Sequence, residues 1–451
     1  MRIVIIGLGT IGKTILKSLS GENHTVTIID ESKDNVEKLI EKYDVQGVVG
    51  NGASLDIQRE AGVRGADVAI ALTRSDELNV FACLVAKKLG VKNTIARVRT
   101  PEYRKQINEM KDELGISMIV NPEEDTASEI YNLINLPEIA KIERFANGSA
   151  LLVEIVAEEG CALVGETLIS IGKNLKTKVL ICAVQRGEEV FIPSGNFVIG
   201  MGDRIYLTSD AKELHDFLSE IKMVKSPLKK IMIVGGSKIG YYLASKLSKK
   251  KYRVKLIESN KKTAEELADA LSHVTVVNGN GARHDLLIEE GIEAMDAFIA
   301  LTDTDEENMV VSMFANKMKV RKIITKIKSD DLYGMLGEVG INTNVSPKDI
   351  VADRVISYVR ALENRRGSNL LSLYRLVNNR VEALEFLAKR QAKIYDKPLR
   401  ELKIKEDCLV ACIIRDNQVI IPDGSSTIKL GDNVIVVTTH KNFDDLMDIF
   451  E

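Results

Sequence analysis

Three glycines and one acid near the start of the chain have the residue types and spacing of a phosphate-binding turn. Gly7, Gly9 and Gly12 follow a strand-like apolar run, and Asp30 lies 18 residues after Gly12. The first glycine permits a tight turn, the second lets a pyrophosphate approach the backbone, and the third lets a helix pack closely on a strand. Free N–H groups at the helix start favour phosphate, and an acid at this distance reaches a ribose. A simple turn is the alternative, but the preceding strand and the acid favour a nucleotide site.

The whole pattern returns in the second half of the chain. The turn Gly7–Gly12 recurs as Gly235–Gly240, and Asp30 recurs as Glu258 at the same offset of 228 residues. Further segments recur at offsets of 229 residues: 48–53 at 277–282, 69–73 at 298–302, 192–195 at 421–424, and 202–203 at 431–432. A near-constant offset of this length indicates a tandem duplication of a module of about half the chain, not a solenoid repeat.

The two glycine turns are not equal. Ser237 stands where the first turn has Gly9, and its side chain narrows the approach to a pyrophosphate. Lys238 beside it has two interpretations, a phosphate-binding cation or a solvated side chain. Glu258 keeps an acid for the ribose but is one methylene longer than Asp30. Both acids favour a free 2′-hydroxyl over a 2′-phosphate, because like charges repel, so NAD or adenosine nucleotides fit better than NADP.

The segments around each turn alternate between strands and helices. In the first module, apolar runs predict strands at 2–6, 25–29, 45–49, 67–72, 93–98 and 117–120, with a helix over 78–89. Such alternation predicts a parallel sheet covered on both faces, with the ligand at the carboxyl ends of the strands. Asn51, Thr73 and Arg74 follow strand ends and should line this crevice, although Asn51 has a simple turn as its alternative.

Basic residues alternate at the end of the fifth predicted strand. Arg97 and Arg99 recur as Lys326 and Lys328 in the second module. One residue of each pair should face the crevice, where it would neutralise phosphates or hold the carboxylate of the next element. Paired surface charges are the alternative interpretation.

A helix beginning at a proline is expected to leave each parallel sheet. Asn121-Pro122 and Ser346-Pro347 are start signals, because a capping residue precedes a proline at the first helical position. The second helix carries a broad apolar stripe, which we predict packs on a neighbouring module: Ile350, Val351, Val355, Ile356, Val359 and Leu362.

The rest of each module has a different pattern. Strands at 151–157, 179–185, 190–192 and 204–207 and a helix at 210–221 predict a small α+β domain, and residues 223–230 form a basic linker. The predicted fold class is therefore α/β, with two tandem modules, each a Rossmann-like parallel-sheet domain followed by a small α+β C-terminal domain.

The composition argues against several classes of protein. Lys and Arg number 62 against 65 Asp and Glu, so the net charge of −3 gives no support for nucleic-acid binding. No apolar run approaches the ~18 residues of a membrane span, and the first residues lack a signal pattern. Five cysteines, an odd count, favour reduced thiols in the cytosol. Cys408 and Cys412 should share one face of a strand, and no metal site is expected.

Recognisable catalytic groups are missing from the sequence. The five histidines do not recur between the modules, and neither a Gly-x-Ser-x-Gly turn nor a Walker phosphate loop is present. We therefore expect no catalytic residue and no enzyme, because nucleotide binding without catalytic groups indicates a sensor. The alternatives are an NAD-dependent oxidoreductase of unknown substrate and, against the acidic charge balance, a nucleic-acid repressor with a Rossmann core.

Taken together, these features resemble the TrkA family, cytosolic regulators of Trk potassium uptake systems. The two modules look like tandem RCK (KTN) units, and the resemblance covers essentially all 451 residues. It rests on the glycine turn with Asp30, on the segments 51–53, 71–73, 192–195 and 202–203, and on their second copies. The resemblance implies RCK N-terminal domains at 1–120 and 228–345 and RCK C-terminal domains at 140–225 and 368–451.

The resemblance also implies ligands, partners and site residues. It implies NAD(H) as cofactor, with ADP and ATP as further ligands. It implies a cytoplasmic homotetramer, a ring of eight modules, that docks on the inner face of the membrane and gates a TrkH-like potassium-transporting subunit. The first site would comprise Gly7, Leu8, Gly9, Thr10, Ile11, Gly12, Asp30, Asn51, Thr73, Arg74 and Arg97. The second would comprise Gly235, Gly236, Ser237, Lys238, Ile239, Gly240, Glu258, Asn280, Thr302 and Lys326, with Ser237 departing from the family pattern.

Overall fold

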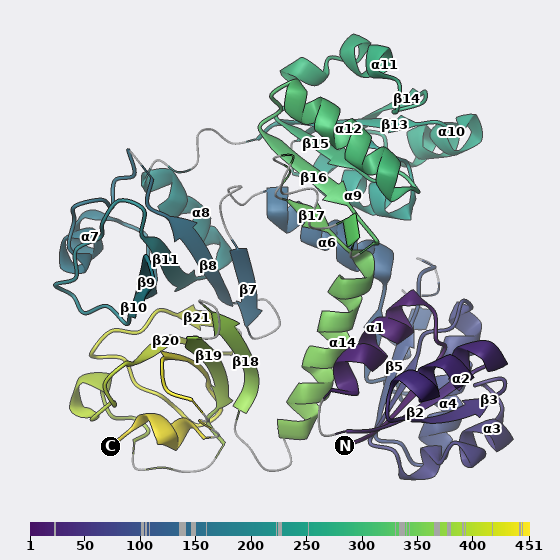
Figure 1. The fold of residues 1–451 in the computed structure, drawn as a ribbon, viewed down its shortest axis with the longest axis horizontal. Helices are drawn as coiled ribbons and strands as arrows, with labels where there is room; N and C mark the ends of the chain where they lie inside the picture. Colours follow the sequence, from purple (N-terminus) through teal and green to yellow (C-terminus); the bar gives the residue numbers. More distant parts are fainter. Residues whose placement is uncertain are drawn as a thin grey trace. The chain divides into compact units, whose positions relative to one another are not determined.

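The computed structural model repeats the two-module organisation of the sequence (Figure 1). It describes residues 1–21, 24–100, 103, 106–107, 109–134, 141–145, 150–158, 160–221, 223, 228–250, 252–329, 331–332, 339, 341, 343–364, 370–376, 380–389, 392, 394–416, 418–441, 443 and 445–451. Contacts divide the chain into two units, residues 1–134 with 228–359, and residues 135–227 with 360–451. Each unit therefore combines the corresponding parts of both modules.

The first sheet domain is a six-stranded parallel sheet with strand order β3-β2-β1-β4-β5-β6. Its strands are β1 Arg2–Ile6, β2 Thr25–Asp30, β3 Gln46–Val49, β4 Val68–Ala71, β5 Asn93–Arg97 and β6 Met118–Val120. Its helices are α1 Thr10–Leu19, α2 Lys33–Lys42, α3 Leu55–Glu60 and α4 Asp76–Lys88. The strand order reverses beside β1, so the β1–α1 turn lies where ligands bind in such sheets. The predicted strands and the predicted helix are confirmed to within about two residues at each end.

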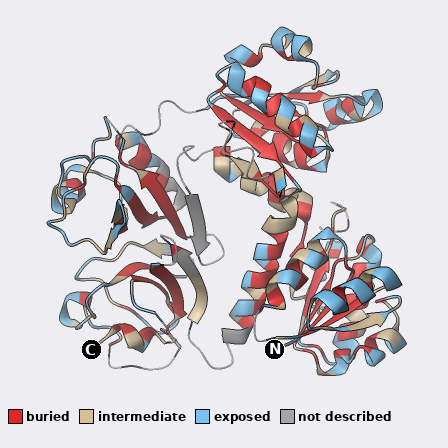
Figure 2. Cartoon of the chain, viewed as in Figure 1, coloured by how far each residue is buried: buried red, intermediate tan, exposed pale blue. Residues whose placement is uncertain are grey.

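The second sheet domain repeats this topology, with strand order β14-β13-β12-β15-β16-β17. Its strands are β12 Lys230–Val234, β13 Arg253–Glu258, β14 Val274–Asn278, β15 Ala297–Ala300, β16 Lys322–Lys326 and β17 Asn344–Val345. Its helices are α9 Lys238–Ser248, α10 Lys261–Ala270, α11 His284–Glu289 and α12 Asp305–Lys317. In both domains the central strands are buried, while the covering helices expose their outer faces (Figure 2). Fully apolar strands such as β1 form because both of their faces are covered.

The helix that leaves the first sheet packs on the second sheet domain. α6, Pro122–Ile134, begins at the predicted proline, and the Asn121 side chain caps it by accepting the Glu123 and Glu124 amides at 3.1 Å. Ala127, Ile130 and Ile134 lie in the hydrophobic core formed by β12, α9 and β13. α6 is therefore part of the first module by its position in the sequence, but its apolar side chains pack in the core of the second sheet domain.

The second connecting helix, α14 at Pro347–Asn364, also begins at its predicted proline. Most of its predicted stripe is buried, with Val351, Val355 and Val359 fully inaccessible to solvent. Ile350 is half-buried, and Leu362 falls in the second unit. Arg354 of α14 forms an ion pair with Asp125 of α6. The two connecting helices are thus parts of one packed unit within a single chain.

The C-terminal domains are five-stranded sheets of the same order, β10-β9-β11-β8-β7 and β21-β20-β22-β19-β18. The first contains β7 Lys141–Phe145, β8 Ala150–Val156, α7 Leu168–Asn174, β9 Leu180–Arg186, β10 Glu189–Phe191, β11 Arg204–Ser209 and α8 Ala211–Glu220. The second contains β18 Leu370–Leu376, β19 Val381–Leu387, β20 Cys408–Arg415, β21 Gln418–Ile420 and β22 Asn433–Thr438. The two domains share one core, in which Leu152, Cys182 and Tyr206 pack with Ala383 and Cys412.

Two details of the C-terminal domains differ from the prediction. The edge strands β7 and β18 were not predicted. Cys408 and Cys412 do not share a face, because a bulge between Val410 and Cys412 shifts the register. Cys412 packs with Leu409, while Val410 belongs to the core on the other side of the strand. Part of the predicted linker, residues 224–227, lies outside the described residues.

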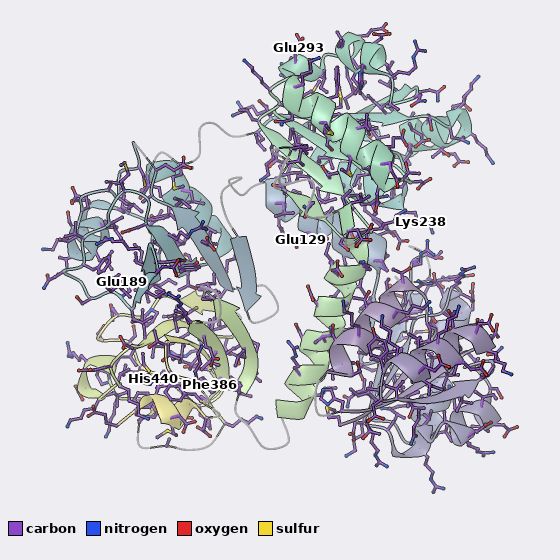
Figure 3. All side chains as sticks on the ribbon, viewed as in Figure 1. Glu129, Glu189, Lys238, Glu293, Phe386 and His440 are labelled. Carbon is purple, nitrogen blue, oxygen red and sulfur yellow. The ribbon has the colours of Figure 1, made fainter. Side chains whose placement is uncertain are left out.

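No helix among the described residues is both long enough and apolar enough to cross a bilayer. The described side chains also contain no group of three or more His, Cys, Asp or Glu residues arranged to hold a metal ion. The sites of interest are therefore the two glycine turns, and their side chains are drawn with the rest of the chain in Figure 3.

Candidate functional site

The first glycine turn has the backbone geometry that its sequence predicts. Gly7 adopts φ +93°, and a Cβ there would lie 2.7 Å from the Thr73 nitrogen. A Cβ on Gly12 would lie 2.2 Å from the Gly7 carbonyl oxygen, so the helix packs tightly on the turn. Nothing lies within 4 Å of the Cβ position of Gly9, which faces open space. The turn is therefore tightly packed against the protein at Gly7 and Gly12, and it is open at Gly9, where a phosphate would approach.

The start of α1 is free to bind an anion. No side chain caps the helix at Gly9, and its first turn contains no acidic residue. Uncapped N–H groups and the positive end of the helix dipole favour phosphate oxygens. The geometry of Gly9, Thr10 and Ile11 therefore fits a pyrophosphate.

Asp30 is positioned by the backbone on both sides of it. Its carboxylate accepts the Leu8 amide at 2.6 Å and the Ser32 amide at 2.9 Å. A carboxylate offers about four acceptor positions, so two amide bonds orient it and leave capacity for ribose hydroxyls. This geometry fits the role predicted for Asp30.

A crevice of about 860 Å³ extends from the turn across the ends of the strands. Ten of the eleven residues predicted for the first site line it: Gly7, Leu8, Gly9, Thr10, Ile11, Asp30, Asn51, Thr73, Arg74 and Arg97. Gly12 does not line the crevice but packs against the Gly7 carbonyl behind the turn. Asn51 also forms the local turn that was its alternative, because its side chain accepts the Ala53 amide at 2.8 Å. The crevice further includes Arg99, Pro122 and Glu123, which places the start of α6 in its wall.

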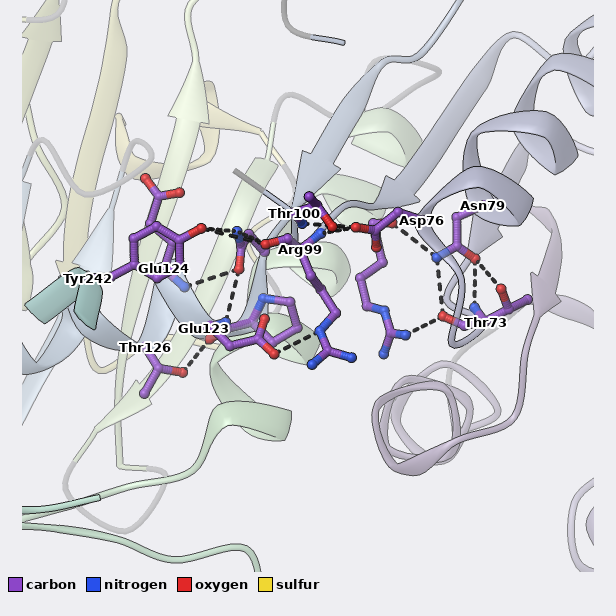
Figure 4. Close-up of polar contacts among 12 residues, drawn as sticks. Thr73, Asp76, Asn79, Arg99, Thr100, Glu123, Glu124, Thr126 and Tyr242 are labelled. Atoms are coloured by element: carbon purple, nitrogen blue, oxygen red, sulfur yellow. Dashed lines mark hydrogen bonds and ion pairs between the residues drawn. The ribbon is translucent and has the colours of Figure 1, made fainter. Parts of the chain in front are cut away.

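The buried side chain of Asn79 connects the backbone segments of two crevice residues. The Asn79 side-chain oxygen accepts the Thr73 amide at 2.7 Å, and its nitrogen donates to the Arg97 carbonyl at 3.0 Å. Asp76 accepts the amides of Arg99 and Thr100, each at 2.9 Å (Figure 4). These two side chains tie the end of β4 to the end of β5 and so fix the backbone positions of the predicted site residues.

Positive charge is concentrated beyond the glycine turn. The Arg97 guanidinium donates to the Thr73 carbonyl, and its Nε is buried without a partner among the described residues. Burial, followed by the nearby charge of Arg99, lowers the pKa of Arg97. Arg99 is paired with Glu123 at 2.8 Å. A desolvated arginine with an unmet donor fits an anionic ligand.

The crevice wall also contacts the second sheet domain. The Asn121 side chain lies 3.5 Å from the Tyr242 hydroxyl of α9, and that hydroxyl lies 3.5 Å from the Arg99 carbonyl oxygen (Figure 4). Lys246, one turn further along α9, donates to Ser128 of α6 at 3.1 Å. The first crevice and the helix of the second glycine turn therefore meet along α6.

The second glycine turn keeps the fold of the first, with two compensating changes. Gly235 adopts φ +109°, and a Cβ on Gly240 would lie 2.3 Å from the Gly235 carbonyl oxygen. The Glu258 carboxylate accepts the Gly236 and Asn260 amides, each at 2.7 Å, as Asp30 does in the first turn. A Cβ on Gly236 would lie 2.8 Å from this carboxylate. The longer acid therefore fits because glycine replaces Leu8.

The predicted second-site residues are brought together around this turn. Ser237 is the N-cap residue that precedes α9, and its buried hydroxyl has no hydrogen-bond partner among the described residues. Lys238 is exposed at the first turn of α9 (Figure 3). Asn280 forms the same local turn as Asn51, accepting the Ala282 amide at 2.8 Å, and Thr302 is held by Asn308 at 2.7 Å.

Lys326 occupies the position of Arg97 but lies deeper. Its Nζ donates to the Leu301 carbonyl at 3.3 Å, and the side chain is buried. Burial, followed by repulsion from Lys328, lowers the pKa of Lys326 to about 8. A second pocket, of about 460 Å³, lies further out and is lined by Asp303, Thr304, Asp305, Glu306, Lys328, Ser329, Asp331 and Leu332.

Sequence analysis did not identify several residues that shape the site. For two of them, Asn79 and Asp76, the internal repeat contained the necessary information. Asn79 and Asp76 recur as Asn308 and Asp305 at the offset of 229 residues, and Asn308 makes the same two backbone contacts. Extending the repeat beyond Thr73 would have found them. Glu123 and Tyr242 carry no such signal, because their role depends on the packing of α6.

Comparison with known proteins identifies the family. The TrkA-N domain matches residues 3–122 and 231–347, and the TrkA-C domain matches residues 152–222 and 384–451. The chain is 31% identical to the Trk system potassium uptake protein TrkA of Vibrio alginolyticus over 447 residues, covering 98% of this chain and 97% of that protein.

The chain belongs to the TrkA family. A homologue from Archaeoglobus fulgidus, also named for the Trk potassium uptake system, is 30% identical and covers all of both chains. Both of these relatives are named as Trk system potassium uptake proteins. Among solved structures, the RCK domain of GsuK matches with a TM-score of 0.60 and 18% identity, over 97% of this chain and 92% of that one. The GsuK channel bound to NAD matches with a TM-score of 0.61 and 18% identity, over 97% and 76%. These likenesses confirm the predicted tandem RCK fold.

Proposed function

We propose that this protein is a cytoplasmic, nucleotide-binding regulatory subunit of a Trk-type potassium uptake system. The observation that carries the proposal is the first crevice, which is lined by an open glycine turn, an oriented Asp30 and the half-buried Arg97. Its ligands are NAD(H) and the adenine nucleotides ADP and ATP, held by the first-site residues named from the sequence. The second-site residues form a weaker dinucleotide site, because Ser237 replaces the open glycine.

The proposed action is the gating of a TrkH-like membrane subunit. A nucleotide shifts a conformational equilibrium only if it binds the two conformations with different affinity. α6 supports such coupling, because it begins in the first crevice and ends in the core of the second sheet domain. We propose a homotetramer whose eight modules form a ring on the inner face of the membrane, with domains at 1–120, 140–225, 228–345 and 368–451.

The test has two measurements. Calorimetric titration of NAD, NADH, ADP and ATP into the full chain should give saturable binding, and the first-site component of this binding should be lost when Asp30→Ala and Gly9→Val are combined. Potassium flux through the cognate membrane subunit in vesicles should then depend on the bound nucleotide. Sustained turnover of nicotinamide absorbance with any substrate would instead favour the oxidoreductase alternative. Flux that ignores nucleotides would rule out the regulatory role.

A further inference from the structure

The loops that follow β4 and β15 hold equivalent residues in equivalent places. Thr73 and Thr302 each donate their amide to a buried asparagine at 2.7 Å. Three residues further on, Asp76 and Asp305 each accept two amides from the loop after the neighbouring strand. Arg74 and Asp303 lie between these fixed points, so the duplication has placed opposite charges at one position of the scaffold.

In the first crevice, Arg74, Arg97 and Arg99 line the part beyond the glycine turn, against Glu123. Glu123 is already paired with Arg99. Arg74 is exposed, and the buried Nε of Arg97 has no acceptor among the described residues. This outer half therefore carries an excess of positive charge.

The corresponding region of the second module is acidic. Asp303, Asp305, Glu306 and Asp331 line the outer pocket, with Lys328 as the cation among the lining residues. Lys328 is engaged, because its Nζ donates to the Asp303 carbonyl at 2.6 Å. The buried Oδ1 of Asp305 has no donor among the described residues, and the same holds for the equivalent Asp76 in the first module. Glu306 likewise corresponds to Glu77, so the reversal of charge between the modules is at Arg74 and Asp303. An additional phosphate would meet repulsion here and attraction in the first crevice.

On the basis of the proposed nucleotide function, we propose that Arg74 and Asp303 determine specificity and give the two crevices opposite preferences for terminal phosphate. A diphosphate occupies the glycine turn in either module. The third phosphate of a nucleoside triphosphate extends into the outer half, where Arg74 stabilises it and Asp303 repels it. The first crevice therefore selects ATP over ADP, and the second selects ADP over ATP.

The test isolates each crevice in the full-length chain. Gly9→Val fills the open Cβ position of the first turn and leaves only the second crevice, and Ser237→Val leaves only the first. ADP and ATP are titrated calorimetrically in metal-free buffer, and thermal unfolding verifies that each variant is folded. We expect ATP to bind about tenfold more tightly than ADP in the first crevice, with the reverse order in the second.

Charge exchange should then reverse both orders. Arg74→Asp in the Ser237→Val chain should select ADP, and Asp303→Arg in the Gly9→Val chain should select ATP. Arg64→Asp, an exposed charge outside the crevice, is the matched control and should change neither ratio. The preferences should shrink at high salt, because exposed charges are screened.

Each outcome has a definite meaning. Retained binding with unchanged ATP-to-ADP ratios after the exchange would overturn this inference and leave the proposed function intact. Failure of the wild-type chain to bind either nucleotide would overturn the proposed function itself. If the second crevice binds ATP only after Asp303→Arg, then Asp303 excludes ATP completely in the wild-type chain, which supports the proposal. If it still excludes ATP after that change, Asp303 is not the determinant.

Discussion

The two sheet domains of this chain keep the same scaffold and differ in the surfaces that face a ligand. Asn79 and Asn308 make the same backbone contacts, and the first and last glycines of both turns have the same close approaches. By contrast, Gly9 has become Ser237, Arg97 has become Lys326, and Arg74 has become Asp303. Residues that hold the backbone have thus been retained where residues that would touch a ligand have diverged. The duplication therefore provides its own internal control.

The largest expected loss of stability comes from placing a charge in either connecting helix. Ile130→Asp in α6 and Val355→Asp in α14 each place a carboxylate at a fully buried position. An unpaired buried charge should cost about 3–5 kcal/mol in the free energy of unfolding and disturb assembly. Urea unfolding and light scattering would measure this, with the exposed Asn132→Asp as control at about 0.5 kcal/mol or less. A Val355→Asp chain with unchanged stability and unchanged solution mass would show that this position of α14 is not part of a packed core.

The shared scaffold is tested by removing its asparagines. Asn79→Ala and Asn308→Ala should each lower the free energy of unfolding by roughly 2–3 kcal/mol, because buried backbone groups lose their partners. The exposed Asn316→Ala should cost much less. Thermal unfolding of the three variants makes the comparison. Clearly unequal losses at Asn79 and Asn308 would show that the two scaffolds are not equivalent.

The difference between the turns is tested by nucleotide affinity. Gly9→Val should abolish binding at the first site by filling the phosphate approach, and Asp30→Ala should cost roughly 1–3 kcal/mol of binding. Ser237→Gly should strengthen dinucleotide binding at the second site, by less than about tenfold. Its hydroxyl has no partner among the described residues, so the change sacrifices no hydrogen bond. Titration of NAD into Gly9→Val chains with and without Ser237→Gly checks this, and equal affinities would make the serine harmless.

The dependence of stability on pH should distinguish Lys326 from Arg97. Burial lowers the pKa of Lys326 from 10.5 to about 8, so the folded protein loses this proton before the unfolded chain does. Below pH 8 the folded protein pays the full free-energy cost of burying the charged Lys326 ammonium group. As the pH rises from about 8 toward 10.5, the folded protein loses this proton and the cost is relieved. Wild type should therefore gain about 1–3 kcal/mol of stability across this window relative to Lys326→Met.

The matched variant for this effect is Arg97→Met. An arginine stays protonated throughout that window, so its replacement should not change the slope of stability with pH. Urea unfolding at several pH values provides the measurement for both variants. Parallel pH profiles for wild type and Lys326→Met would show that Lys326 is not buried as a cation.

Much of the fold follows from local sequence signals. Buried parallel strands are continuous apolar runs, and β1 and β12 also end on glycine turns, so their type and position could be predicted. Pro122 and Pro347 marked the connecting helices because proline suits the first helical turn. The edge strand β7 offered no such signal, because Lys141–Phe145 alternates only briefly between polar and apolar residues. The bulge in β20 was equally hidden, since register depends on the partner strand.

The site was predictable as far as the backbone motif extends. Gly7–Gly12 and Asp30 identified the crevice because the motif directly encodes a turn, a helix start and an acid at fixed reach. Glu123 could not be found this way, since it reaches the crevice only because α6 begins there. The accommodation of Glu258 by Gly236 was also invisible, because it depends on a distance of 2.8 Å between groups 22 residues apart.

The position of α6 has a consequence for how such a chain can arise. Ala127, Ile130 and Ile134 complete a core whose other members come after residue 227. A single-module ancestor could form the same contact between two subunits that exchange this helix. Joining two copies end to end then converts a contact between subunits into one within a chain, and no interface residue needs to change. The packing of α6 also has a consequence for separating the two halves. Residues 1–134 alone would expose three apolar side chains, and the second half alone would have a gap in their place.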